Sequence, residues 1–210
     1  MHSKNILTAG KKIEETGKAL IMLHGRGSTA ENILSLDGDL RVDNYTLIAP
    51  QATNNSWYPY SFLEPPSRNE PWLSSALKLM GAIVDDLTKL IGKKNIYFLG
   101  FSQGACLMLE FVTRNADGYG GCIALTGGLI GDKIYAENYK GNFQLTPVFI
   151  GTGDPDPHVP LERVHETTRI LKKMNASVIE KVYEGIGHTI IQDEFDHANE
   201  ILSEKKEIPR

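Results

Sequence analysis

The chain has 210 residues, of which 41% are hydrophobic and 23% are charged, an ordinary composition for a globular protein. Its formal net charge is −4, so no basic excess points to nucleic acid as a partner. The N-terminus lacks the apolar core of a secretory signal, and no apolar run approaches the roughly 20 residues of a membrane helix. We therefore expect a cytoplasmic protein without an integral membrane segment, folded as one domain over residues 1–210.

Short apolar runs alternate along the chain with helical patterns. The runs that predict strands are residues 19–23, 45–49, 96–99, 122–125, 148–150 and 178–183. Apolar residues at helical spacing predict helices over residues 73–90, 105–112, 161–174 and 195–202. Continuous apolar strands with helices between them are typical of an α/β protein, with a mostly parallel sheet covered by helices on both faces.

Polar and chemically active residue types follow several of these predicted strands. They are His24, the segment from Gln51 to Trp57, Ser102, the pair Asp154 and Asp156, and His188. In an open parallel sheet the ligand crevice lies beyond the carboxyl ends of the strands. We therefore expect these side chains to meet at one edge of the sheet.

Ser102 lies between two glycines, in Gly100-Phe101-Ser102-Gln103-Gly104, where a predicted strand becomes a predicted helix. The pattern matches G-x-S-x-G, a sharp turn that presents a nucleophilic serine. The alternative is an ordinary tight turn in which Ser102 caps the helix. A serine hydroxyl needs a neighbouring base, and that base needs a third group to orient it, so an acid and a histidine should follow later in the chain.

Both partners have candidates after later strands. Asp154 and Asp156 lie two residues apart, and periodicity alone does not choose between them. His188 follows the last predicted strand in Gly185-Ile186-Gly187-His188, and His158 in the aspartate loop is the rival base. The order serine, acid, histidine is that of the α/β-hydrolases.

These segments, together with "LHGRG", "APQ", "GFSQGA", "GDPDPHVP" and "YEGIGH", resemble the phospholipase/carboxylesterase family of α/β-hydrolases, which includes acyl-protein thioesterase-like enzymes and small bacterial carboxylesterases. The resemblance extends over nearly the whole chain from residue 18. It implies an α/β-hydrolase fold and a catalytic triad of Ser102, Asp156 and His188. It also implies that the backbone N–H groups of Arg26 and Gln103 form the oxyanion hole.

The resemblance does not assign the Arg26 side chain, because many relatives have an apolar residue at this position. Arg26 either reaches toward an anionic substrate or lies along the surface. His24 is expected to satisfy backbone groups under the oxyanion loop rather than to bind a metal, because no histidine pair has the local spacing of a zinc site. No metal and no cofactor are predicted.

The segment from Gln51 to Trp72 is long, non-periodic and rich in aromatic residues, which favours a functional loop. Its side chains either wall an apolar substrate pocket or cover the sheet edge; the candidates are Trp57, Tyr58, Tyr60, Phe62 and Leu63. The chain is too short for a large lid domain. An open cleft favours small or single-chain esters and thioesters.

The predicted function is therefore a carboxylesterase or thioesterase of the EC 3.1 class that acts through an acyl-enzyme. Alternatives on the same scaffold are a lysophospholipase or acyl-protein thioesterase proper, a dienelactone hydrolase and a peptidase. Dienelactone hydrolases typically carry cysteine where this chain has Ser102. A non-catalytic binding module is a further alternative. The expected partner is a small-molecule ester or thioester substrate. A homodimer is the oligomeric state that we consider.

Overall fold

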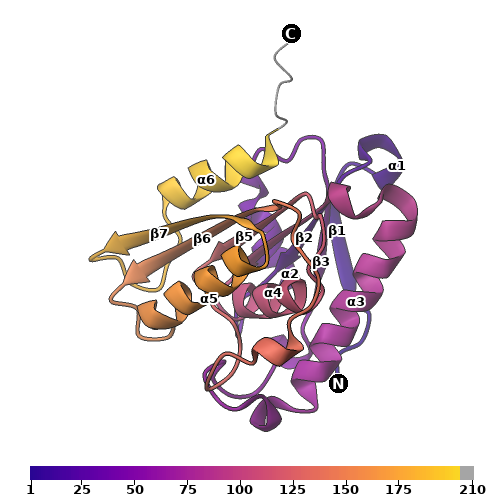
Figure 1. Cartoon of the computed structure of the whole chain (residues 1–210). Helices are drawn as coiled ribbons and strands as arrows, with labels where there is room; N and C mark the ends of the chain where they lie inside the picture. Colours follow the sequence, from indigo (N-terminus) through magenta and orange to yellow (C-terminus); the bar gives the residue numbers. More distant parts are fainter. Residues whose placement is uncertain (204–210) are drawn as a thin grey trace.

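The computed structural model describes residues 1–203, in which seven strands form one sheet. The strand order is β1-β3-β2-β4-β5-β6-β7, with β1 antiparallel to β3 and every other neighbouring pair parallel (Figure 1). The strands are β1 (Ile6–Gly10), β2 (Ala19–Leu23), β3 (Thr46–Pro50), β4 (Ile96–Phe101), β5 (Gly121–Leu125), β6 (Pro147–Asp154) and β7 (Ser177–Glu184). The prediction of a single domain over 1–210 stays a prediction, since 204–210 lie outside the described residues.

Helices cover both faces of this sheet. The α-helices are α1 (Ile13–Thr16), α2 (Ala30–Leu34), α3 (Trp72–Ile91), α4 (Gln103–Arg114), α5 (Leu161–Lys173) and α6 (Gln192–Leu202). Short 3₁₀ turns occupy Ser35–Asp39, Thr53–Asn55, Pro66–Asn69, Lys93–Asn95 and Ala136–Asn138. Helices α3, α4 and α5 pack on one face, and α2 and α6 pack on the other (Figure 1).

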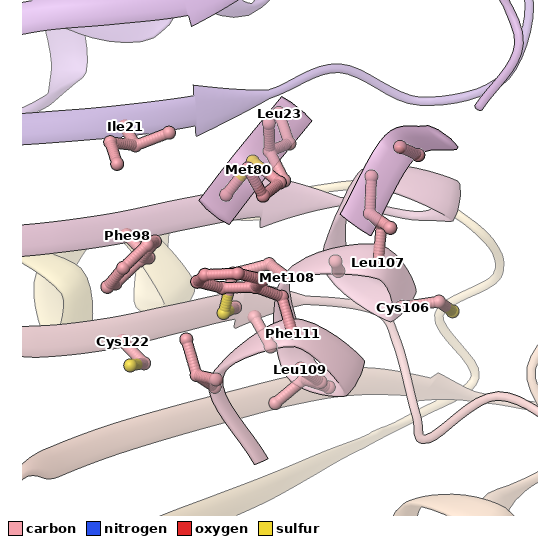
Figure 2. Packing of buried hydrophobic residues seen from close by; sticks show 14 of the residues in the cluster. Ile21, Leu23, Met80, Phe98, Cys106, Leu107, Met108, Leu109, Phe111 and Cys122 are labelled. Atoms are coloured by element: carbon pink, nitrogen blue, oxygen red, sulfur yellow. The ribbon is translucent and has the colours of Figure 1, made fainter. Parts of the chain in front are cut away.

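The continuous apolar strands are buried on both sides, as the sequence predicts for a parallel sheet. Every residue of β2 is fully buried. Ile21 and Leu23 face α3 and α4, whereas the alternate residues Leu20 and Met22 face α2 and α6. Figure 2 shows the first of these cores, in which Phe98 of β4 lies among side chains from the covering helices. This core fixes β2 and β4 side by side, and their carboxyl ends carry the proposed site.

Each predicted strand and helix is present, and the predicted mostly parallel sheet with helices on both faces is confirmed. Among the strands and α-helices, three lack a prediction. Strand β1 is a half-buried antiparallel edge strand with Thr8 at its centre, so it has no apolar run. Helices α1 and α2 have only 4 and 5 residues, too few for a helical period to be visible.

The described residues contain no helix that is long and apolar enough to cross a membrane. The longest helix, α3, is amphipathic and buries one face against the sheet. Cys106 and Cys122 are both buried and unpaired, and burial raises the pKa of the Cys106 thiol to about 12. Both cysteines therefore pack as small core side chains.

Candidate active site

The turn between β4 and α4 has strained backbone at Ser102 and close backbone contacts at its two glycines. Ser102 has φ 55° and ψ −119°, which is left-handed backbone that a non-glycine residue rarely adopts. A Cβ added to Gly104 would lie 2.1 Å from the Leu23 carbonyl oxygen, and one on Gly100 would lie 2.7 Å from the backbone of Ala105. The flanking glycines thus let β4, α4 and the end of β2 approach closely, and the turn projects the Ser102 side chain.

Ser102 is joined to His188 and Asp156 by a chain of two short hydrogen bonds. Ser102 Oγ lies 2.7 Å from His188 Nε2, and His188 Nδ1 lies 2.7 Å from Asp156 Oδ2. A carboxylate only accepts hydrogen bonds, so Nδ1 carries the proton and Nε2 is the acceptor of the serine hydroxyl. The three residues lie in the turns and loops that follow β4, β6 and β7. This is the hydrogen-bond geometry that activates a serine.

The carboxyl group in this chain belongs to Asp156, whereas Asp154 ends β6 and is exposed. Asp156 Oδ1 accepts hydrogen bonds from the backbone N–H groups of His158 and Val159 at 2.7 and 3.0 Å. Burial alone would raise the pKa of Asp156, but these two bonds and the His188 imidazole outweigh it and hold the pKa below its ordinary value. The carboxyl group is therefore ionised at neutral pH.

His158, the rival base, lies beside the triad without joining it. Its ring packs perpendicular to the His188 ring, with centroids 4.9 Å apart. The Phe101 ring also contacts the His188 ring, at 5.3 Å between centroids. His188 is thus held by ring packing as well as by its hydrogen bonds.

Two backbone N–H groups lie next to Ser102. Gln103 is the first residue of α4, so its N–H has no acceptor within the helix. The N–H of Arg26, in the turn after β2, has no acceptor among residues 1–203. A Cβ on Gly25 would lie 3.5 Å from the Ser102 Cβ, so this turn runs directly alongside the serine. The two donors are available to an oxygen anion at the reacting carbon.

His24 supports this turn from beneath. It is fully buried, its Nδ1–H donates to the Gly25 carbonyl at 2.7 Å, and its Nε2 accepts from the Ala52 N–H at 3.1 Å. Burial lowers the pKa of His24, although the bond to Gly25 opposes the shift. Within residues 1–203 no group of three or more His, Cys, Asp or Glu side chains is placed to hold a metal ion.

A cavity of about 700 Å³ opens in front of Ser102 and His188. Its apolar lining includes Tyr58, Phe62, Leu63, Phe101, Cys106 and Val159. Residues 58–62 form one side of the cavity, and we call residues 56–62, which include them, the lining segment. Phe101, the residue before the serine, and Val159 were not predicted, although the first is the variable position of the G-x-S-x-G pattern itself.

Trp57 was predicted to contact substrate, and the structure corrects this. Tyr58 and Phe62 line the cavity, but Trp57 does not. Its side chain is fully buried in the core and turned away from the cavity lining, and its indole N–H donates to the His24 carbonyl at 2.9 Å. In the core the indole N–H has a hydrogen-bond acceptor and the apolar ring is removed from water, which explains why the Trp57 side chain is buried there.

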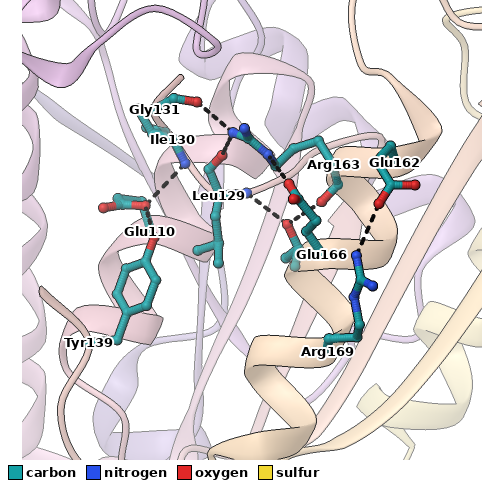
Figure 3. Close-up of polar contacts among 10 residues, drawn as sticks. Glu110, Leu129, Ile130, Gly131, Tyr139, Glu162, Arg163, Glu166 and Arg169 are labelled. Atoms are coloured by element: carbon teal, nitrogen blue, oxygen red, sulfur yellow. Dashed lines mark hydrogen bonds and ion pairs between the residues drawn. The ribbon is translucent and has the colours of Figure 1, made fainter. Parts of the chain in front are cut away.

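A second loop, residues 127–131, is hydrogen-bonded to the lining segment, and we call it the supporting segment. Figure 3 shows Leu129, Ile130 and Gly131 of this loop with the side chains that hold it. Glu110 of α4 is fully buried and holds this loop from one side. Its carboxylate accepts hydrogen bonds from the Ile130 N–H at 3.1 Å and the Tyr139 hydroxyl at 3.2 Å. The other carboxylate oxygen pairs with Arg114 Nε at 2.7 Å. The buried charge is thus fully compensated.

Arg163 of α5 holds the supporting segment from the other side. Its guanidinium donates to the Leu129 and Gly131 carbonyls at 3.0 and 2.6 Å, and it is 7% exposed (Figure 3). The Gly131 N–H then donates to the Phe62 carbonyl at 2.7 Å. The supporting segment therefore joins the cavity lining to the helical layer.

With this geometry established, comparisons with known proteins place the chain in a family. A family model described as phospholipase/carboxylesterase matches residues 5–205. The chain belongs to this family. A phospholipase/carboxylesterase from Dyadobacter fermentans, solved by crystallography, is similar at 55% identity and TM-score 0.95, covering 96% of this chain and 98% of that chain. The predicted α/β-hydrolase fold is thereby confirmed, and residues 1–203 contain no large lid domain.

Curated relatives with lower identity carry more specific names. Acyl-protein thioesterase 1 of Gibberella zeae is 32% identical over 130 residues, which are 60% of this chain and 54% of that protein. Acyl-protein thioesterase 1 of Saccharomyces cerevisiae is 25% identical, covering 91% of this chain and 94% of that protein. The chain spans only about half the length of several such relatives.

Proposed function

We propose that this phospholipase/carboxylesterase family member is a serine hydrolase that cleaves carboxylic esters or thioesters through an acyl-enzyme. The observation that carries the proposal is the hydrogen-bond chain from Ser102 through His188 to Asp156, with 2.7 Å at each step. The proposed roles are nucleophile for Ser102, general base and acid for His188, and orienting carboxylate for Asp156.

In the first half-reaction, Ser102 Oγ forms a bond to the substrate carbonyl carbon while its proton moves to His188 Nε2. The carbonyl oxygen becomes an anion, and the backbone N–H groups of Arg26 and Gln103 are the proposed donors to it. Each such donor lowers the barrier by about 3 kcal/mol in enzymes of this type. Asp156, which is ionised, stabilises the imidazolium that forms.

The tetrahedral intermediate then collapses. The bond to the leaving alcohol or thiol breaks, and His188 Nε2–H gives that group its proton, which leaves Ser102 acylated. In the second half-reaction a water molecule gives a proton to His188 and attacks the acyl carbon. Collapse of this second intermediate returns the proton to Ser102 Oγ and releases the carboxylic acid.

The cavity volume supports small or single-chain acyl groups as the substrate class. Lysophospholipase or acyl-protein thioesterase activity is the second candidate, supported by relatives named acyl-protein thioesterase 1. Dienelactone hydrolysis and peptide cleavage are further alternatives, and assays with a dienelactone and with an aminopeptidase substrate test for them. A cytoplasmic location, a homodimeric assembly and the absence of a nucleic-acid partner belong to the proposal as well.

The test is hydrolysis of p-nitrophenyl esters and acyl thioesters of increasing acyl length by the wild type and by Ser102→Ala. We expect the variant to lose at least about 1,000-fold in kcat, because the nucleophile is gone. Ser177→Ala, at the exposed start of β7, is the matched control and should keep full activity. Equal rates for Ser102→Ala and the wild type would refute the mechanism.

A further inference from the structure

Arg26 lies in the turn after β2, which we call the oxyanion turn, and its guanidinium holds the lining segment. Its Nη1 donates to the Ser56 hydroxyl at 3.0 Å and to the Pro59 carbonyl at 2.8 Å. Its Nη2 donates to the Tyr60 carbonyl at 2.6 Å. The same guanidinium lies 5.9 Å from the centre of the Tyr58 ring. One side chain therefore contacts four residues of this segment.

Gln103, the residue after Ser102, holds the same segment through its side-chain amide. Its Oε1 accepts from the Trp57 N–H at 2.9 Å, and its Nε2 donates to the Tyr58 carbonyl at 2.8 Å. Unlike Arg26, which is exposed, Gln103 is only 6% exposed. Together the two side chains bind the carbonyls of three consecutive residues, 58–60, and the N–H of the residue before them.

Arg26 and Gln103 are also the two residues whose backbone N–H groups we propose as the oxyanion hole. Their side chains therefore fix the cavity lining in the same frame as the groups that hold the reacting carbonyl. We propose that the Arg26 side chain is a specificity-determining positioning residue, which sets how the cavity receives acyl groups larger than acetyl. This inference rests on the proposed esterase function. Of the two sequence-based alternatives, it follows the one in which Arg26 lies along the surface, and it adds a role for the side chain there.

The effect should grow with the size of the acyl group. An acetyl group ends one carbon beyond the reacting carbonyl, so it depends least on the lining segment. A butyryl or longer group needs a wall at a fixed distance, because a shift of the wall by about 1 Å weakens the apolar contacts by up to about half. Because Arg26 is exposed, removing it leaves no buried unpaired charge, and the variant is expected to fold.

The experiment uses the whole chain with Arg26→Met, which keeps the backbone N–H. We expect kcat/KM for p-nitrophenyl butyrate to fall about tenfold, mainly through KM, and that for the acetate to fall by less than about threefold. Hydrogen–deuterium exchange of the backbone in residues 56–62 should become about tenfold faster, since three hydrogen bonds to the segment are lost.

Two further variants make the test specific. Arg68→Met is the matched control, because the Arg68 guanidinium lies 4.9 Å from the Tyr60 ring and makes none of the hydrogen bonds described above; it should leave activity and exchange unchanged. Arg26→Lys keeps the charge without the planar fork and should behave like Arg26→Met within about threefold. Full recovery by Lys would show that charge alone acts and would overturn the proposal.

An equal fall in kcat of Arg26→Met for all esters would locate the defect in the oxyanion turn and would overturn the proposal. Unchanged hydrogen–deuterium exchange of residues 56–62 in Arg26→Met would also overturn the proposal. Failure of the proposed function is recognised separately, by a wild type that hydrolyses no ester and does not react with a fluorophosphonate. The exchange measurement on residues 56–62 needs no activity, so it tests the structural role of Arg26 in either case.

Discussion

The lining segment and the supporting segment are neighbouring loops held by different kinds of polar contact. The lining segment is held at its exposed side by Arg26, whose charge stays in water. The supporting segment is held by Glu110 and Arg163, which are 0% and 7% exposed. A buried charge that loses its partner costs several kcal/mol, whereas an exposed one costs little. We infer that the supporting segment determines stability and that the lining segment can be altered to change specificity.

The largest effect in stability is expected from Glu110→Leu. The substitution leaves the Ile130 N–H and the Tyr139 hydroxyl without their acceptor in the protein interior. Each buried donor that loses its acceptor costs about 1–3 kcal/mol, so the two together cost about 2–6 kcal/mol. Urea unfolding should therefore show a strongly lowered midpoint.

The control comes from the same region of Figure 3. Arg169 pairs with Glu162 at 3.0 Å, but both side chains are exposed, at 66% and 74%. Arg169→Met should change the free energy of unfolding by less than about 0.5 kcal/mol. If the two variants lost similar stability, burial would not be what separates the two segments.

Glu194 on the opposite face of the sheet tests what happens to a buried carboxyl group with too few partners. Its Oε2 accepts from the Ile191 N–H at 3.0 Å, while Oε1 is buried without a hydrogen-bond partner among the described residues. Burial raises the pKa of Glu194 to about 7, against the bond from Ile191. The folded state therefore binds its proton more tightly than the unfolded state does.

A raised pKa of a carboxyl group gives stability that is fully present below the unfolded value and is lost as the pH rises through 7. Glu194→Gln removes this dependence and keeps an oxygen acceptor for Ile191. The variant should gain about 2–3 kcal/mol relative to the wild type between pH 5 and pH 8.5. The free energy of unfolding of both proteins should be measured across this pH range. A difference between them that does not change with pH would exclude titration of Glu194 as the cause.

A smaller effect is expected from Gln103→Glu, which puts a carboxylate oxygen against the Tyr58 carbonyl in place of an N–H donor. Loss of this buried hydrogen bond should cost about 1–3 kcal/mol in unfolding and loosen the lining segment. Gln192→Glu adds the same charge at the exposed start of α6 and should stay within about 0.5 kcal/mol of the wild type. A Gln103→Glu protein as stable as this control would mean that the amide does not hold the segment.

The sequence predicts those parts of the molecule whose cause is local. The run at 19–23 predicts β2 because each of its residues is buried, and the glycines beside Ser102 predict a strained turn because a Cβ there meets backbone. Strand β1 escaped prediction because one side of an edge strand faces solvent and its apolar signal is weak.

Contacts between distant residues have no local pattern and could not be predicted. Arg26 and Tyr60 are 34 positions apart, and Gln103 and Trp57 are 46 apart. Aromatic character alone did not distinguish Tyr58, which lines the cavity, from Trp57, which packs behind it. Trp57 is buried because its indole N–H donates a hydrogen bond to the His24 carbonyl. This contact forms only when the end of β2 and the lining segment come together in the folded protein.

The most direct measurement of the central claim is the site and stoichiometry of acylation. Wild-type protein mixed rapidly with a p-nitrophenyl ester should release a burst of one nitrophenolate per chain. Mass spectrometry of the quenched protein should find the acyl group on the peptide that contains Ser102. Acylation of Cys106, which also lines the cavity, or steady hydrolysis with no acylated peptide would contradict the account.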